Sequence, residues 1–407
     1  MNNYIEQIRS HFPALQQQIY GKPLVYLDNA ATAQKPQQVL ALLAEMDGMI
    51  NGNIHRSVHY LSTKCTELYE NARKSACRFI GAAHEHEVIF TSGVTAGVNL
   101  TAFSFGEAFV KEGDVILVGE SEHHSNIVPW QLLCARKRAT VRMWPIDEQG
   151  KLRMDLLPEL LDERVRLVAV SHISNVLGLV NPIQEIVEVA HTYDIPVLID
   201  GAQGVVHEKI NVCDLKCDFY LFSGHKLYGP TGTGILYGRE RWLEKMPPWQ
   251  GGGDMITSVS FSGTTFADLP LKFEAGTPNF IGQAGLGAAI EYMESLERDV
   301  LEVYSRMLVQ TGMELFQKIG GLRMYGVGDR EKIPLFSFSV AGVHATDMAI
   351  LLDKMGFAVR SGQMCAEPVL VKYGQTSLLR ASFAMYNTQE ELHQFVEALH
   401  KVISMLR

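Results

Sequence analysis

The sequence predicts an α/β protein, in which a large unit built on a mainly parallel sheet is followed by a smaller α+β unit. Three observations lead to this prediction. Between about residues 86 and 238, short apolar runs alternate with helix-like segments. Each run is apolar throughout, which is typical of strands buried on both faces of a sheet. After about residue 280 the pattern changes to long helical stretches and a run that alternates apolar and polar residues.

The predicted strands of the large unit end in small or polar residues, which mark the start of loops. They cover residues 88–90, 115–118, 167–170, 197–199 and 219–222. Helical segments such as 183–193 lie between several of them. A helix between two strands is the usual connection of parallel neighbours, so we expect a sheet covered by helices.

The C-terminal part predicts a different mixture of elements. Residues 284–319 have a mostly helical pattern that breaks at Gly320-Gly321. Residues 335–340 alternate between apolar and polar side chains, as half-solvated strands do. Residues 379–383 predict a second strand, and 392–406 repeat apolar residues at helical spacing.

The length of the chain favours more than one domain. At a prior of roughly 150 residues per domain, 407 residues correspond to two or three. We expect an N-terminal segment (1–20) that packs on the small domain, a large domain (21–294) and a small C-terminal domain (295–407).

Composition excludes several classes of protein. The 36 basic and 45 acidic side chains leave a formal net charge of −9, which argues against a nucleic-acid partner. We expect no membrane span, because no run of eighteen apolar residues occurs, and no secretory signal at the N-terminus. The six cysteines are scattered, so we expect no disulfide framework and a cytoplasmic location.

Polar side chains follow five of the predicted strands or their loops. They are Thr95, His123, Asn175, Asp200 and Lys226. In open α/β sheets, ligands bind in a crevice at the carboxyl ends of the strands. We therefore expect these five residues to surround one site.

Lys226, in Ser223-Gly224-His225-Lys226, is the strongest single signal. A lysine directly after a buried strand can lower its pKa and act as a nucleophilic amine toward a carbonyl. Asp200, which ends another predicted strand, can pair with a protonated pyridine nitrogen. A lysine amine and an aspartate in these roles are the pair that pyridoxal phosphate requires.

A phosphate group needs free donors, and residues 91–97 can supply them. Thr91-Ser92-Gly93-Val94-Thr95-Ala96-Gly97 lies between a predicted strand and a helix. Small residues, hydroxyls and the free N–H groups of a helix N-terminus suit a phosphate. Many strand–helix loops look similar, so this segment indicates a phosphate site only together with Lys226 and Asp200.

The segment 223–232 resembles the cofactor-lysine motif of cysteine desulfurases. The resemblance is to the Suf-type group, which includes selenocysteine lyases, within the class V aminotransferase family. It extends along nearly the whole chain through Leu27-Asp28-Asn29-Ala30-Ala31-Thr32, Asn53-Ile54-His55-Arg56, Glu122-His123-His124, Asp200-Gly201-Ala202-Gln203, Glu274-Ala275-Gly276-Thr277-Pro278-Asn279 and Arg360-Ser361-Gly362-Gln363-Met364-Cys365-Ala366. It implies the fold type I of pyridoxal-phosphate-dependent transferases, which is similar to aspartate aminotransferase.

The resemblance also implies roles for single residues. Lys226 would bind the cofactor covalently, and Cys365 would attack the sulfur of the substrate. The other implied cofactor contacts are Asp200 at the pyridine nitrogen, Gln203 at the ring oxygen, His123 on the ring face as a proton carrier, Asn175 beside the ring, and Thr95, Ser223, His225 and the Val94 amide at the phosphate. The implied substrate contacts are Asn175 and Arg380 at the carboxylate with Arg360 nearby, together with His55 and Arg56; Arg56 and Thr277 would come from the second subunit of a homodimer.

Two positions depart from the family pattern. The usual Gly-Thr-Thr-Glu of the phosphate loop reads Gly93-Val94-Thr95-Ala96, so one hydroxyl is lost. The usual His-Cys pair reads Met364-Cys365, and a Gln common after it is Glu367. Methionine cannot donate a proton or stabilise a thiolate as a protonated histidine can.

The implied reaction converts L-cysteine to L-alanine and leaves the sulfur as a persulfide on Cys365. A Suf-type acceptor protein would then collect the sulfur for iron–sulfur cluster assembly. Selenocysteine lyase, with L-selenocysteine as substrate, is the alternative within the same family. The short segment around Cys365 implies a recessed persulfide and slow turnover until a dedicated acceptor arrives.

Two hypotheses from other classes remain open on the sequence alone. One is a metal-dependent hydrolase that uses His123, His124 and Cys365 with a carboxylate. Adjacent histidines at one strand end point in different directions and seldom bind the same ion, so we expect no metal. The other is a catalytically silent scaffold that binds sulfur-transfer partners.

Overall fold

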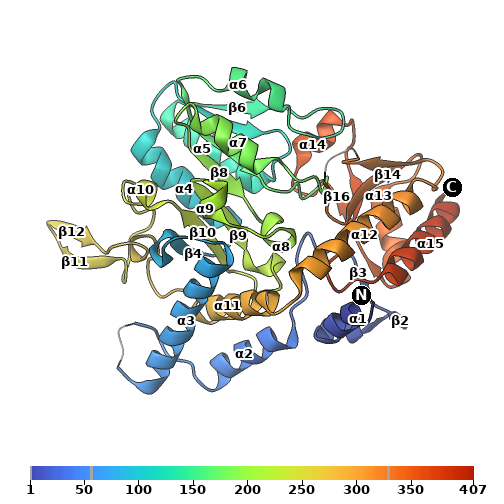
Figure 1. Ribbon diagram of the computed structural model, residues 1–407, viewed down its shortest axis with the longest axis horizontal. Helices are drawn as coiled ribbons and strands as arrows, with labels where there is room; N and C mark the ends of the chain where they lie inside the picture. Colours follow the sequence, from blue (N-terminus) through green and yellow to red (C-terminus); the bar gives the residue numbers. More distant parts are fainter. Residues whose placement is uncertain (1, 56–57, 328–330) are drawn as a thin grey trace.

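The structure is a computed structural model that describes residues 2–55, 58–327 and 331–407. In Figure 1, most of the blue to yellow elements form a large body, and the orange to red elements lie beside it together with the dark blue N-terminal elements α1 and β2. The N-terminal part contains α1 (Asn2–Ser10), β1 (Gln18–Ile19), β2 (Lys22–Pro23), β3 (Val25–Tyr26), α2 (Gln37–Gly48) and α3 (Tyr60–Phe79).

A seven-stranded sheet forms the centre of the large body, in the order β4-β10-β9-β8-β7-β5-β6. Its strands are β4 (Val88–Thr91), β5 (Val115–Gly119), β6 (Thr140–Trp144), β7 (Val165–Ser171), β8 (Val197–Asp200), β9 (Phe219–Ser223) and β10 (Gly234–Gly238). The pairs from β6 through β9 are parallel, whereas β10 is antiparallel to both of its neighbours. The predicted α/β class with a mainly parallel sheet is confirmed.

Helices cover both faces of this sheet because its strands are apolar on both sides. In β5, Ile116 and Val118 belong to one core cluster, and Val115 and Leu117 to another. The first cluster includes side chains of α4 (Val94–Phe109) and α5 (Val128–Lys137), and the second includes side chains of α3, α7 (Ile183–His191) and α11 (Phe280–Glu294).

The C-terminal part has its own sheet and core. The sheet has the order β13-β14-β17-β16, from β13 (Leu322–Tyr325), β14 (Leu335–Val340), β16 (Arg360–Gly362) and β17 (Leu378–Ser382). Around it lie α12 (Arg298–Phe316), α13 (Ala345–Lys354), α14 (Glu367–Lys372) and α15 (Gln389–Leu406). Ile5 of α1 packs into this core, while Ile8 packs into the large one. The predicted boundaries between domains stay a prediction.

The mostly helical pattern of residues 284–319 is confirmed, since α11 and α12 cover most of it with an interruption at residues 295–297. One expectation for this part was wrong. The strand at 335–340 is buried apart from Ser339, which is partly buried, and is not half-solvated. Its polar Ser337 is buried because the hydroxyl donates a hydrogen bond to the carbonyl of Val176.

The remaining elements are short. They are β11 (Ile256–Ser260) and β12 (Gly263–Phe266), which form a projecting hairpin in Figure 1, β15 (Phe357–Ala358), α6 (Leu157–Leu160), α8 (Gly204–His207), α9 (Val212–Leu215), α10 (Glu240–Leu243), and the 3₁₀ turns η1 (Pro13–Gln16), η2 (Glu85–Glu87), η3 (His124–Asn126), η4 (Met154–Leu156), η5 (Gly224–Lys226) and η6 (Leu271–Phe273). Among the described residues, no helix is both long and apolar enough to cross a membrane.

Candidate active site

A cleft of about 260 Å³ opens at the carboxyl ends of the central parallel strands. It collects eleven of the residues that the sequence predicts for the site: Val94, Thr95, His123, Asn175, Asp200, Ser223, His225, Lys226, Arg360, Cys365 and Arg380. Loops of the large sheet and two strands of the small sheet therefore meet at one place. Polar residues that follow the predicted strands indicated Thr95, His123, Asn175, Asp200 and Lys226. The family resemblance indicated the other six.

Three predicted site residues do not line this cleft. Gln203 lines a void of about 10 Å³ behind Lys226, and its amide donates to the carbonyl of Ala30. His55 is 3.0 Å from the Glu70 carboxylate, and Thr277 is exposed. Arg56 lies outside the described residues.

Lys226 follows β9, whose five residues are all buried, through the single turn η5. Gly224 is required in this turn because a Cβ there would lie 2.2 Å from the Thr233 hydroxyl. Burial lowers the pKa of the Lys226 amine, and the nearby Asp200 carboxylate opposes this shift. An amine with a lowered pKa is a better nucleophile and base near neutral pH.

Asp200 ends β8 and is 5% exposed. The Ala202 amide donates to one carboxylate oxygen at 2.9 Å, and no other hydrogen bond from the described residues reaches this carboxylate. Burial raises the pKa of Asp200, and Lys226 lowers it. A buried carboxylate with a free oxygen suits a cationic partner such as a protonated pyridine nitrogen.

The N-terminus of α4 closes one end of the cleft. Gly93, at φ 137°, turns the chain into the helix, and the Val94 amide donates to the Ser223 hydroxyl at 2.9 Å. The Val94 amide, which we expected at a phosphate, is thus already engaged. The next amide, that of Thr95, lies in the first turn of α4. N–H groups in the first turn lack acceptors within the helix and favour an anion.

His123 caps the turn that follows β5. Its Nδ1 accepts a hydrogen bond from the Ser125 amide at 3.1 Å, so a neutral ring carries its proton on Nε2. Burial lowers the pKa of His123 to about 4, and the positive charge of Lys226 adds to this. At neutral pH the imidazole is therefore uncharged and can donate from Nε2 toward the cleft.

Two arginines of the small sheet share one aspartate. Arg380, 2% exposed, donates to the carbonyl of Asn175 at 2.8 Å and to Asp28 at 3.2 Å. Arg360 makes a two-pronged pair with Asp28, with hydrogen bonds as short as 2.8 Å. Two guanidinium groups against one carboxylate leave a net positive charge for an anionic substrate group. Asp28 belongs to the family motif at residues 27–32, but the sequence analysis assigned it no role.

Glu122 is a second buried residue without a role in the sequence analysis. Its carboxylate accepts from the Ser171 amide at 2.8 Å and from the Asn126 amide group at 2.7 Å. Burial raises the pKa of Glu122 to about 8, against the lowering effect of these hydrogen bonds. Glu122 thereby ties the end of β5 to the end of β7 and fixes His123 beside it.

Cys365 lies in the turn between β16 and α14 and is exposed. Its carbonyl accepts from the His124 amide at 2.7 Å. The Asn175 side chain donates to the carbonyl of Met364 at 2.8 Å, so a residue expected at the substrate carboxylate also holds the cysteine turn.

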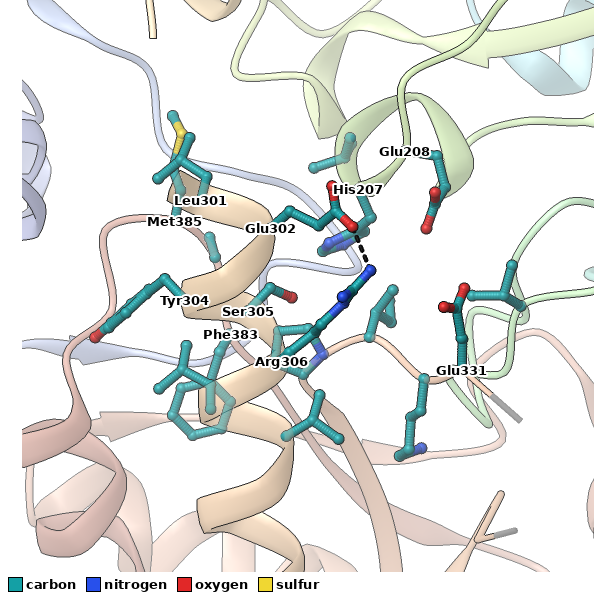
Figure 2. A pocket seen from close by; sticks show the side chains of 18 of the residues that line it. His207, Glu208, Leu301, Glu302, Tyr304, Ser305, Arg306, Glu331, Phe383 and Met385 are labelled. Atoms are coloured by element: carbon teal, nitrogen blue, oxygen red, sulfur yellow. Dashed lines mark hydrogen bonds and ion pairs between the residues drawn. The ribbon is translucent and has the colours of Figure 1, made fainter. Parts of the chain in front are cut away.

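A larger cavity of about 480 Å³ lies between α12 and loops of both bodies (Figure 2). Two of its basic groups already have partners. Arg306 pairs with Glu302, and Lys332 donates a hydrogen bond to the Leu177 carbonyl. No predicted cofactor residue lines it. The chemistry therefore belongs to the smaller cleft.

The hydrolase hypothesis gains no support. Among the described residues, no three His, Cys, Asp or Glu side chains are placed to hold a metal ion. His123 accepts from the Ser125 amide, and His124 accepts from the Glu367 amide at 3.2 Å, so each imidazole has one ring nitrogen engaged.

Comparison with known proteins agrees with this geometry. The family described as Aminotransferase class-V matches residues 25–395. A cysteine desulfurase of Salmonella agona (strain SL483) is 46% identical over 403 residues, which cover 99% of each chain. The crystal structure of the cysteine desulfurase CsdA (S-sulfonic acid) from Escherichia coli has a TM-score of 0.92 at 39% identity and covers 99% of both chains. A cysteine desulfurase from Thermococcus onnurineus NA1 has a TM-score of 0.91 at 34% identity, covering 97% of this chain and 98% of that one.

Proposed function

The chain belongs to the class V aminotransferase family, and on that premise we propose that it is a pyridoxal-phosphate-dependent cysteine desulfurase. The enzyme converts L-cysteine to L-alanine and carries the removed sulfur as a persulfide on Cys365. The observation that supports this most is the meeting of Lys226, Asp200, Arg380 and Cys365 on one cleft. This set provides a cofactor lysine, a carboxylate site and a sulfur nucleophile together.

The residues present fit pyridoxal phosphate. We assign the Lys226 amine to covalent attachment and the free oxygen of Asp200 to the pyridine nitrogen. The N-terminal turn of α4 at Thr95, with Ser223 and His225, would hold the phosphate. Gln203 would reach the ring oxygen from behind Lys226. When bound, the cofactor withdraws electrons from the substrate and makes its Cα proton acidic.

The protein's own residues then perform the remaining work. Arg380 and Asn175 orient the substrate through its carboxylate, since arginine can make two parallel hydrogen bonds to that group. The Lys226 amine removes the Cα proton. The uncharged His123 donates a hydrogen bond from Nε2 and so stabilises the negative charge that develops as this proton leaves.

The sulfur transfer belongs to Cys365. Its thiolate attacks the substrate sulfur, a new S–S bond forms, and the Cβ–S bond breaks. The electron pair of the broken bond stays on the substrate carbon, which takes up a proton and becomes the methyl group of alanine. A thiolate is required because the neutral thiol is a poor nucleophile.

We also propose a homodimer and a Suf-type sulfur acceptor for iron–sulfur cluster assembly. Thr277 lies away from the cleft of a single chain, in keeping with its expected contribution to the site of a second subunit. All six cysteines are free, in keeping with a reducing cytoplasm.

An absorbance spectrum followed by product analysis tests the proposed function. We expect the purified protein to be yellow, to change its spectrum when L-cysteine is added, and to form alanine and sulfide in the presence of a reductant. A colourless protein that forms no alanine after incubation with pyridoxal phosphate would contradict the proposal.

A further inference from the structure

The turn that carries Cys365 has an unusual backbone. Met364 and Cys365 have φ values of 54° and 52°, so two consecutive residues with side chains adopt the left-handed region. Such residues are strained and persist only where the surroundings hold them. The contacts that hold this turn therefore decide where the Cys365 thiol lies.

The Met364 side chain supplies no polar anchor. It is 6% exposed and packs into the core of the large body. Within the turn, the Ala366 amide donates to the Gln363 carbonyl at 3.0 Å. Two further contacts to the turn come from Asn175 and His124, on loops of the large sheet.

His124 contacts the turn on both sides of Ala366. Its amide donates to the Cys365 carbonyl at 2.7 Å, and its Nε2 accepts from the Glu367 amide at 3.2 Å. Glu367 is the first residue of α14, where amides have no acceptor within the helix. The imidazole thus caps α14 and fixes the helix end of the turn.

His124 does not line the cleft, although its neighbour His123 does. It is the first residue of η3, in the loop that follows β5, and the hydrogen bond between the buried Glu122 and Asn126 side chains holds this loop. A rigid strand end of the large body therefore holds the cysteine turn of the small body.

We propose that His124 is a positioning residue, whose Nε2 acceptor holds the Met364–Cys365 turn so that the thiol faces the substrate sulfur. This inference rests on the proposed desulfurase function. Without the acceptor, the Glu367 amide loses its partner and the strained turn can relax. A small displacement of a reacting group can cost up to about 100-fold in rate.

Two substitutions with side chains of similar length distinguish the loss of the hydrogen-bond acceptor from the change in side-chain shape. In His124→Gln, the amide oxygen can accept from the Glu367 amide, whereas in His124→Met the thioether is only a weak acceptor. For the cofactor-loaded His124→Met enzyme we expect kcat to fall about tenfold or more with an unchanged KM for cysteine, because Arg380 is untouched. We expect His124→Gln to recover most of the lost kcat.

Alkylation by iodoacetamide gives a second readout that needs no turnover. Peptide mass spectrometry follows each cysteine separately in the cofactor-loaded proteins. Cys365 is already exposed in the wild type. We expect it to react faster in His124→Met, because the released turn leaves the thiol free to reorient toward the reagent. The buried Cys65, Cys77, Cys134 and Cys217 should stay protected, which excludes general unfolding. Gln363→Ala is the matched control, since it removes only the exposed Gln363–Glu367 side-chain contact.

The outcomes are distinguishable. Slower turnover with faster Cys365 alkylation in His124→Met, both reversed in His124→Gln, supports the proposal. Equal defects in the Met and Gln variants, or wild-type values of both readouts in His124→Met, overturn it. If His124→Met does not load cofactor, His124→Leu replaces it under the same criteria. Should the wild type not desulfurate cysteine at all, the alkylation rates still decide the role of His124.

Discussion

The two side chains that we propose to react, Lys226 and Cys365, stand on very different structural supports. Lys226 follows the fully buried strand β9 of the seven-stranded sheet, and Asp200 ends the neighbouring central strand β8. Cys365 is exposed on a turn with two left-handed residues, which hydrogen bonds from two loops and the buried Met364 side chain hold in place. The comparison teaches that the cofactor half of the site is fixed by buried strands, whereas the half that carries Cys365 is fixed by contacts between segments far apart in the chain.

Substitution of Lys226 should have the largest effect, because it removes the proposed attachment point of the cofactor. We expect Lys226→Ala to abolish turnover and the yellow colour while the melting temperature of the fold stays close to the wild-type value. Absorbance and an alanine assay measure the two losses. Normal alanine formation by this variant would contradict the cofactor role of Lys226.

Substitution of Cys365 should stop sulfur transfer and leave cofactor binding intact. In Cys365→Ser we expect cofactor colour and the cysteine-induced spectral change to persist, while desulfuration stops because a hydroxyl is a far weaker nucleophile than a thiolate. Selenium release from L-selenocysteine should survive better, which also probes the selenocysteine lyase alternative. Cysteine desulfuration at the wild-type rate would show that the persulfide does not form on Cys365.

Substitution of Arg380 probes the boundary between the two halves. Losing one partner of a buried charged pair costs about 2–5 kcal/mol, and about 1.4 kcal/mol is a factor of ten. We therefore expect Arg380→Ala to raise the KM for cysteine by about 30-fold or more. The matched change Arg360→Ala should do less, since that side chain is 45% exposed. A larger effect at Arg360 would assign the carboxylate to it instead.

The smallest expected effect is on the pH profile. An ordinary histidine becomes charged near pH 6.5, whereas burial lowers the pKa of His123 to about 4. A lowered pKa means that His123 keeps its neutral form as the pH falls through 6.5 and loses it only near 4. The acid limb of kcat that depends on His123, measured against His123→Gln, should therefore lie below pH 5. A His123-dependent loss centred near pH 6.5 would contradict the neutral donor.

The sequence predicted the half that carries Lys226 better than the half that carries Cys365, and the reason is physical. Lys226 and Asp200 follow short runs that are apolar throughout, and such runs are typical of buried strands. Strands β6 and β10 were not among the predicted strands of this sheet. The antiparallel direction of β10 was also not predictable, because an apolar run carries no information on parallel or antiparallel pairing. Asp28 and the turn contacts of His124 depend on segments far apart in the chain, so no local pattern indicates them.

The most direct test of the central claim is a single turnover with L-cysteine in the absence of reductant, followed by mass spectrometry of the cysteine peptides. The account predicts one alanine for each sulfur atom added, with the added sulfur on Cys365. Exposed Cys213 is the internal comparison and should stay unmodified. Alanine formed with no added sulfur on Cys365, or with the sulfur on Cys213, would contradict the account.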